Sequence, residues 1–314
     1  MIAHKNIFKD LCRLILWYPI RWIVLILPFT SVYWIGGVMG YIDYFISGRK
    51  RVQKMRMNVS DALGINGEKA KTIVRKNLQN HLRNMIELIK YPKLNRQNIV
   101  SLVQYEGIDY LNNALEKEKG VILLTAHFGA KQFLQVALGL QGYPLHQINF
   151  HMGAEELSFI QRQISQRQRI NIERQLPLNF IPAKGFMRPV FKCLKKNEVL
   201  IIAGDGIGLK RHMDLTYSPF DFLGKKMFFP TNAAVLAERT GAIIVPVFVI
   251  RDKTRHRIVF EPPLECGTRE HIEVIKDFIL LLEKYIHRYP FFWEFWEEFD
   301  EDNLLMSSLE QGYS

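Results

Sequence analysis

The pattern of hydrophobic and polar positions changes at about residue 100. Between residues 67 and 92 the apolar residues recur at helical intervals, and Pro92 ends the pattern. After residue 100, short apolar runs predict strands near residues 121–125, 145–150, 178–181, 198–203, 243–249 and 256–260. Amphipathic segments between them predict helices near residues 130–140, 153–169, 185–196, 231–240 and 270–288. This alternation is typical of an α/β fold with a mostly parallel mixed sheet flanked by helices.

Two polar residues come directly after apolar runs of the predicted sheet. His127 follows the run VILLT at residues 121–125, and Asp205 follows VLIIA at residues 199–203. Ligands of such sheets bind beyond the carboxyl ends of the strands, where both side chains emerge if the two strands are parallel. Residues 206–230, rich in Gly, Pro and aromatic residues, are too many for a simple connection. We expect them to form a loop that lines the same site.

The most apolar stretch of the chain lies near its beginning. Residues 22–42 are 21 residues without a charge, and a helix needs about 20 residues to cross a bilayer. Pro28 and several glycines would bend such a helix, and its Trp and Tyr residues favour the membrane interface, so a helix lying in one leaflet is an alternative. A buried hydrophobic hairpin is a further alternative. We expect an N-terminal hydrophobic membrane-anchor helix within residues 1–50.

Charge is distributed unevenly along the chain, whose net charge is +11. Residues 1–100 contain 17 Lys and Arg against 5 Asp and Glu, whereas residues 101–314 contain 25 against 26. The basic cluster GRKRVQKMR at residues 48–56 follows the apolar stretch. This position favours anionic phospholipid headgroups as its partners and places the bulk of the chain on the cytoplasmic side. No nucleic-acid-binding motif accompanies the cluster, so we expect no nucleic-acid partner.

The cysteine and glycine patterns argue against several kinds of site. Cys12, Cys193 and Cys266 are far apart and lack CxxC or Cys/His spacing, so they indicate neither a disulfide framework nor a zinc site. The sequence GDGIG at residues 204–208 lacks the spacing of a phosphate-binding loop or a dinucleotide fingerprint. We therefore expect no metal and no redox cofactor.

His127 is the first candidate for chemistry, although a histidine after a strand is more often a hydrogen-bonded structural residue. Gly129 permits a close approach of the backbone, and the helix predicted from residue 130 begins with unpaired amides near residues 129–131 that suit an oxyanion. Gln132 lies in the first turn of that helix, where it would orient the imidazole and fix its tautomer. A neutral His127 held in this way can take a proton from an attacking hydroxyl or amine.

The sequence around His127 resembles a known motif. AHFGAKQF at residues 126–133 is similar to the block of the lysophospholipid acyltransferase superfamily, and specifically of its lipid A biosynthesis late acyltransferase (lauroyl/myristoyl transferase) branch. In that block a histidine is followed, after four intervening residues, by Glu or Asp. Further blocks agree in order and spacing: INFH at 148–151, FIPAKG at 180–185, AGD at 203–205, SPFDFLGKKMFFPTNAAVLAERTGAIIVPVFVIR at 218–251 and FEPPLE at 260–265.

The resemblance implies an α/β fold and the transfer of a fatty acyl group to a hydroxyl or amine of a lipid or glycolipid. The donor would be a thioester of acyl carrier protein or coenzyme A, with membrane lipids as the other partners and no cofactor besides the donor. The resemblance also implies His127 as the general base. It further implies a protein of the inner membrane whose catalytic domain lies on the cytoplasmic side.

We divide the chain into a hydrophobic membrane anchor (1–50), a basic helical region packed on the core (51–100), an acyltransferase α/β domain (101–300) and a tail (301–314).

The acidic position of the motif is occupied by Gln132, which departs from the family's pattern. An amide oxygen can orient the imidazole, but it cannot stabilise the imidazolium with a full negative charge. The result is a slower enzyme, an enzyme for a more reactive acceptor, or a lipid-binding protein without turnover. We expect an active or weakly active transferase, because the other blocks are intact. A hydrolase in which His127 activates water is a third hypothesis, although no G-x-S-x-G nucleophile elbow is present.

Three further residues are candidates for substrate binding beside Gly129. His151 stands where the relatives carry Arg, so we expect it to alter a phosphate or donor contact, with a surface loop residue as the alternative. Lys184 precedes a predicted helix and is expected to hold an anionic group. Asp205 agrees in place with the acidic residue of the family and is expected to hold a polar group of the substrate or to support the loop.

Overall fold

A seven-stranded sheet forms the centre of the computed structural model, which describes residues 7–149, 158–182, 187–205, 217–267 and 269–299. The strand order is β1-β9-β8-β2-β5-β3-β4. The strands are β1 (Val103–Glu106), β2 (Val121–Thr125), β3 (Leu145–Asn149), β4 (Asn179–Pro182), β5 (Val199–Ala203), β8 (Ile243–Asp252) and β9 (Arg255–Phe260). Neighbours are parallel except β8 and β9, which are antiparallel. The mostly parallel mixed sheet is thus confirmed, while β1 was not predicted.

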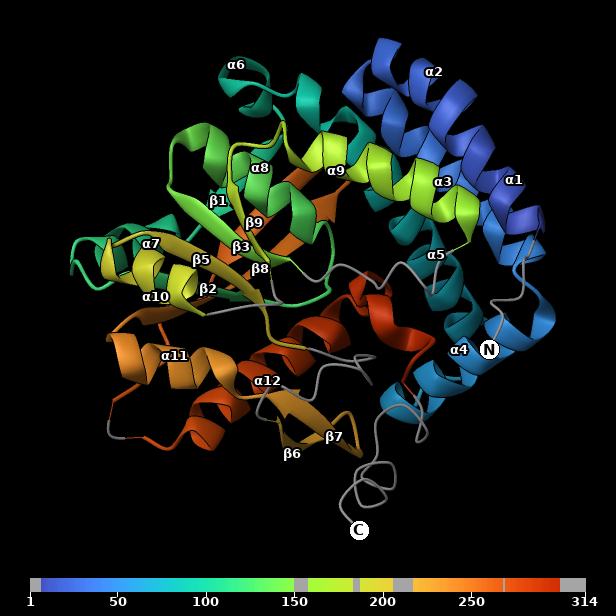
Figure 1. Cartoon of the computed structure of the whole chain (residues 1–314). Coiled ribbons are helices and arrows are strands. Elements are labelled where there is room, and N and C mark those ends of the chain that lie inside the picture. Colours follow the sequence, from blue (N-terminus) through green and yellow to red (C-terminus); the bar gives the residue numbers. More distant parts are fainter. Residues whose placement is uncertain (1–6, 150–157, 183–186, 206–216, 268, 300–314) are drawn as a thin grey trace.

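Helices cover both faces of this sheet (Figure 1). Successive residues of β2 belong to two separate hydrophobic clusters: Ile122 and Leu124 pack with α11 and α12, whereas Val121 and Leu123 pack with α8. A strand covered on both faces is apolar at every position, which explains the uninterrupted run in the sequence. The covering helices are α7 (Ile108–Leu115), α8 (Lys131–Gln141), α10 (Arg188–Lys195), α11 (Asn232–Thr240) and α12 (His271–Arg288).

The N-terminal helices lie together beside the sheet (Figure 1). They are α1 (Ile7–Ile15), the π-helix η1 (Leu16–Ile20), α2 (Arg21–Ile26), α3 (Phe29–Ile46), α4 (Arg49–Leu63) and α5 (Gly67–Lys90). Within the described residues, no helix is long and apolar enough to cross a membrane. The expected single anchor helix is therefore corrected: Leu27 is extended, with ψ 154°, and Pro28 begins a new helix, so residues 22–42 are divided between α2 and α3.

Glycines allow α3 to lie directly on α5. An added Cβ at Gly36 would overlap the backbone of Arg83, and one at Gly40 would overlap the backbone of Gln79. Because only glycine permits this approach, the glycines of the apolar segment have a packing role rather than bending one long helix. Arg83 and Gln79 also donate hydrogen bonds to backbone carbonyls of α3.

Part of the expected loop at residues 206–230 is a β-hairpin. Its strands β6 (Tyr217–Phe222) and β7 (Lys225–Pro230) are antiparallel; residues 206–216 lie outside the described part. The turn between the strands places Leu223 and Gly224 at positive φ, which a two-residue hairpin turn requires. The remaining helical segments are η2 (Tyr91–Lys93), α6 (Arg96–Ile99), η4 (Gln161–Gln166), α9 (Arg167–Glu173), η5 (Pro290–Phe292) and η6 (Glu294–Trp296).

Candidate active site

His127 and Asp205 form a hydrogen-bonded pair at the carboxyl edge of the sheet. The strands β2 and β5 pair in parallel with Thr125 opposite Ala203, so the residues two positions beyond each strand end become neighbours. The Nδ1 atom of His127 lies 2.7 Å from Oδ1 of Asp205, and the backbone amide of His127 donates to Oδ2 at 2.7 Å. Asp205 is completely buried, whereas the imidazole is 29% exposed. Nε2 is therefore the ring nitrogen left for a proton of the substrate.

The Asp205 carboxyl is held in its charged form. Burial raises its pKa, but the charge and hydrogen bonds of His127 and the nearby Lys131 ammonium more than compensate, so the net pKa is below the ordinary value. An ionised Asp205 accepts the Nδ1 proton and thereby leaves the lone pair on Nε2. This is the arrangement that a general-base histidine requires.

Gln132 does not have the place at the ring that the sequence predicted for it. Asp205, on the neighbouring strand end, occupies Nδ1, and within the described residues the Gln132 side chain makes no hydrogen bond to His127. The imidazole therefore has a carboxylate partner, although position 132 holds an amide. The role predicted for Gln132, to orient the ring and fix its tautomer, is carried by Asp205, which we had expected to contact the substrate or support a loop.

The amide of Gly129 does not point to an oxyanion site, contrary to its predicted role as a donor, because it is used in another hydrogen bond. The φ of Gly129 is +60°, and an added Cβ would overlap the carbonyl oxygen of Val249 on β8. Its amide donates to the carbonyl of Phe292 at 2.9 Å, so that N–H is already used. The helix α8 that follows has no side-chain cap. The amide of Lys131 remains a predicted donor to an oxyanion, whereas the amide of Phe133 already donates to the carbonyl of Ala130 at 2.8 Å.

A C-terminal aromatic segment, residues 292–295, runs along the loop that carries His127. The backbone amide of Glu294 donates to the carbonyl of His127 at 2.8 Å, and Phe128 forms an antiparallel bridge with Trp293. The ring of Phe295 lies 4.5 Å from the imidazole, centroid to centroid. The loop that carries His127 is thus held between this segment and β8. Its backbone position depends on contacts made about 165 residues away in the sequence.

Behind the loop lies a buried polar network, centred on Arg251. Its guanidinium contacts the Glu87 carboxylate at 2.8 Å and donates to Asn84 Oδ1 at 2.6 Å and to Asn80. Asn84 in turn donates to the carbonyl of Gly129 at 2.7 Å and to Glu294 Oε1 at 2.8 Å. The network therefore connects α5 and β8 to both segments that hold His127.

His256 completes the network on the side away from the loop. Its Nε2 lies 3.3 Å from Glu87 Oε2, and both side chains are completely buried. Tyr33 lies 3.2 and 3.3 Å from the two ring nitrogens, and Phe133 stacks on the ring at 3.8 Å. Burial lowers the pKa of His256, although Glu87 partly opposes this shift. This histidine is a neutral structural residue.

A lysine next to the dyad adds a positive charge to the site. Lys131 is half-buried at the start of α8. Burial lowers the pKa of its ammonium, while the carboxylates of Glu294 and Asp205 act in the opposite direction. A cation at this helix N-terminus reinforces the attraction for a developing negative charge.

The chain is similar to known acyltransferases. A family model described as bacterial lipid A biosynthesis acyltransferase matches residues 8–296. The chain belongs to this family. It is also similar to a phosphatidylinositol mannoside acyltransferase of Mycolicibacterium smegmatis, with 25% identity over 215 residues that cover 67% of each chain. A solved 1-acyl-sn-glycerophosphate acyltransferase from Thermotoga maritima covers 81% of this chain and 97% of its own at 14% identity, with a TM-score of 0.35.

Of the six site residues predicted for this acyltransferase, four lie in the described part. His127, Gly129 and Gln132 lie between the end of β2 and the first turn of α8. Asp205 lies just beyond the end of β5, beside His127. His151 and Lys184 lie outside the described residues, so their roles stay predictions. Sequence reasoning missed the network around Arg251. Its signal was present in α5, where Asn77, Asn80 and Asn84 recur at helical spacing on the face that also carries buried apolar residues.

Proposed function

We propose that this acyltransferase moves a fatty acyl group from an acyl thioester to a hydroxyl or amine of a lipid or glycolipid. The observation that carries the proposal is the His127–Asp205 pair, with Nδ1 held at 2.7 Å and the imidazole partly exposed. Nε2 takes the proton of the acceptor while the acceptor oxygen or nitrogen bonds to the thioester carbonyl carbon. The tetrahedral intermediate then expels the thiolate, and the imidazolium returns the proton to sulfur. Asp205 stabilises the imidazolium between these steps.

The donor in this proposal is acyl carrier protein or coenzyme A carrying the acyl group. Both present the same thioester, so the chemistry at His127 is identical for either one. The reaction needs acid–base catalysis and oxyanion stabilisation, which the dyad, the α8 amides and Lys131 would supply. We propose no metal or redox cofactor.

We further propose that the protein works at the surface of the inner membrane, on its cytoplasmic side. Exposed apolar side chains on α2 and α3 support an attachment parallel to the membrane plane: Ile26 is 83% exposed, Trp34 73% and Phe45 65%. Soluble monomers rarely expose large apolar surfaces, and aromatic residues favour the interface. The basic residues that follow in α4 favour anionic headgroups. Membrane lipids are then both the surface and the source of the acceptor.

The alternative of a catalytically impaired, lipid-binding protein loses its main support because of Asp205. It rested on the missing acid at position 132, and a buried carboxylate contacts the imidazole from another strand. The Gln132 side chain is free to contact the acceptor or donor in this proposal. We therefore retain the active transferase and treat a lipid-binding protein without turnover as an outcome of the experiment.

The test is mass spectrometry of lipids from cells that produce wild-type protein or His127→Ala. We expect a lipid that gains the mass of an acyl group with the wild type and not with the variant. The exposed His271, which pairs with Glu238 on the surface, supplies the matched control His271→Ala, which should behave as the wild type. Identical lipid profiles for the wild type and His127→Ala, with equal protein levels, would reject the transferase. Release of free fatty acid without a new lipid would support the hydrolase instead.

A further inference from the structure

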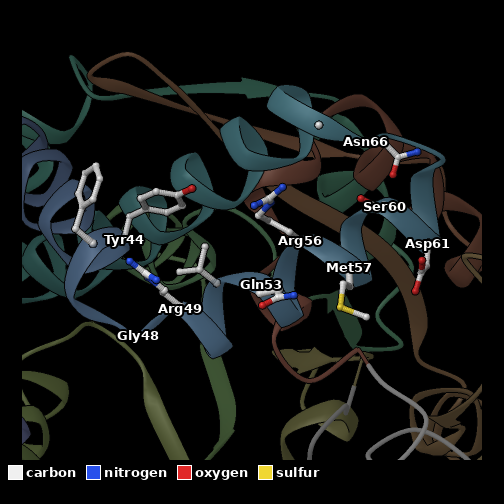
Figure 2. Close-up of a pocket in the computed structure, with 12 residues that line it drawn as sticks. Tyr44, Gly48, Arg49, Gln53, Arg56, Met57, Ser60, Asp61 and Asn66 are labelled. Atoms are coloured by element: carbon white, nitrogen blue, oxygen red, sulfur yellow. The ribbon is translucent and has the colours of Figure 1, made fainter.

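A groove of about 790 Å³ lies along α4, apart from the catalytic dyad. Figure 2 shows its lining, which extends from Tyr44 and Arg49 at one end to Asp61 and Asn66 at the other. The 15 residues of α4 give this helix a length of about 22 Å. The opposite face of α4 is buried, and Asn58 on that face donates to the carbonyl of Trp296 at 2.8 Å. The groove therefore faces away from the segment that contacts His127.

Hydrogen-bond donors form a row along one wall of the groove. Arg49, Gln53, Arg56 and Ser60 follow at intervals of four, three and four residues, so they share one face of α4. The Nε of Arg56 is buried and has no hydrogen-bond partner among the described residues. A buried N–H of this kind costs free energy unless a ligand accepts it. Asp61 is the single acid among the lining residues.

Arg51 belongs to the same basic cluster as Arg49 and Arg56, but it does not line the groove. Its guanidinium donates to Glu297 at 2.6 Å and to Ser47 at 2.8 Å, so its charge is compensated inside the protein. Both ends of the groove also coincide with helix N-termini: α4 begins after Gly48 and α5 after Asn66, each without a side-chain cap. Arginines together with uncapped helix N-termini suit a phosphate.

Apolar residues continue from the groove onto the exposed surface of α3. Tyr44, Phe45, Val52 and Met57 contribute to the lining. Beyond the groove, Ile42 and Ile46 are exposed on α3, four positions apart and thus on one face of the helix. A ligand that fits both parts has a phosphate at one end and hydrocarbon at the other.

We propose that this groove binds the phosphate headgroup of an anionic phospholipid, whose acyl chains lie along the exposed face of α3. The proposal rests on the proposed attachment to a membrane and adds a specific site to it. The bound lipid is a surface ligand rather than the acyl acceptor, because the groove and His127 lie on different sides of α4. Its binding would orient the protein on the membrane.

The experiment measures binding of the full chain to vesicles of phosphatidylcholine alone and of phosphatidylcholine with phosphatidylglycerol. The test variant is Arg49→Gln/Arg56→Gln. The matched control is Lys50→Gln/Lys69→Gln, because Lys50 on α4 and Lys69 on α5 are exposed and lie outside the groove lining, and their substitution removes the same charge. We expect the test variant to lose roughly tenfold more affinity for the anionic vesicles than the control does. Arg49→Lys/Arg56→Lys should recover part of the loss.

Several results would overturn the proposal. Equal losses in the test and control variants would show that diffuse charge attracts the membrane without a site. Displacement from vesicles by millimolar glycerol phosphate would assign the groove to a soluble phosphate. Unchanged vesicle binding with weakened binding of acyl carrier protein would assign it to an acidic protein. Failure of the wild type to bind either vesicle would also reject the proposed membrane attachment, whereas the transferase itself is tested separately, since His127→Ala should bind vesicles normally.

Discussion

Among the histidine–carboxylate pairs of the described residues, His127–Asp205 and His256–Glu87 have contrasting surroundings, which separate a candidate reactive pair from a structural one. His127 meets Asp205 at 2.7 Å at the edge of the sheet, and its ring is 29% exposed. His256 meets Glu87 at 3.3 Å with both side chains sealed from solvent. Tyr33 is near both nitrogens of His256, whereas Asp205 occupies only one nitrogen of His127. The residue types are alike, so access to the second ring nitrogen decides which histidine can exchange a proton with a substrate.

The largest effect is expected from Asp205→Asn. In serine proteases the corresponding change lowers turnover about 10⁴-fold because it favours the wrong tautomer, and we expect a loss of about 10³–10⁴ in acyl transfer. The measurement is turnover of the purified protein with an acyl thioester and a lipid extract. Glu198→Gln is the matched control, since Glu198 contacts His146 at 2.7 Å in a pair remote from the reaction. Retention of more than a tenth of the activity would show that Asp205 is not the orienting group.

The buried pair should instead control stability. Arg251→Met removes the cation beside the buried Glu87 and is expected to lower the free energy of unfolding by about 3–5 kcal/mol. Urea denaturation measures this change. Arg257→Met is the control, because the partly exposed contact of Arg257 with Glu106 should contribute at most about 1 kcal/mol. A similarly small loss for Arg251→Met would mean that the network is dispensable for the fold.

Asn84 connects the structural pair to the reactive one, so Asn84→Ala should affect turnover. The variant removes the donor to the Gly129 carbonyl and to Glu294. We expect kcat to fall about tenfold with little change in KM, since a misplaced His127 loop weakens transition-state contacts. The control is Asn58→Ala, whose buried side chain donates to the carbonyl of Trp296, outside residues 292–295. If both variants lower kcat equally, the effect comes from general destabilisation.

The buried His256 should also make the stability of the protein depend on pH. Burial lowers the pKa of folded His256 below that of the unfolded chain, which is about 6.5. Its contribution to stability is therefore complete above about pH 6.5 and is lost as the pH falls toward the folded pKa, because the unfolded state binds the extra proton. Urea denaturation at several pH values should show this loss in the wild type. The slope should be smaller in His256→Gln, and a slope equal to that of the wild type would contradict this assignment.

The smallest effect is expected from Gln132→Glu. Because Asp205 already occupies Nδ1 of His127, a carboxylate at position 132 does not supply a missing orienting group. We expect turnover to change by less than about fivefold, which corresponds to about 1 kcal/mol. A rise of a hundredfold would show that the absent acid does limit the rate, and would return the acidic position of the motif to the catalytic centre.

Most of the central sheet could be predicted from the sequence. The apolar runs located six of the seven strands of the central sheet, and the polar residues after β2 and β5 were correctly expected at one sheet edge. Both results follow from local patterns, because a strand buried on two faces is apolar throughout. The short β1, Val103–Glu106, contains Gln104 and Glu106 and lacked that signal. The hairpin of β6 and β7 was missed because Pro and Gly suggested a loop.

The amino-acid sequence by itself determined the α/β class, the family and the identity of His127 as the candidate base. These depend on local periodicity and on a motif whose residues are contiguous. Only the tertiary structure decided that Asp205, rather than Gln132, holds the imidazole, that the amide of Gly129 is already bonded, and that the N-terminal apolar stretch is divided at Pro28. Each of these depends on which segments distant in sequence become neighbours. That pairing is set by strand register and helix packing, which a linear pattern does not contain.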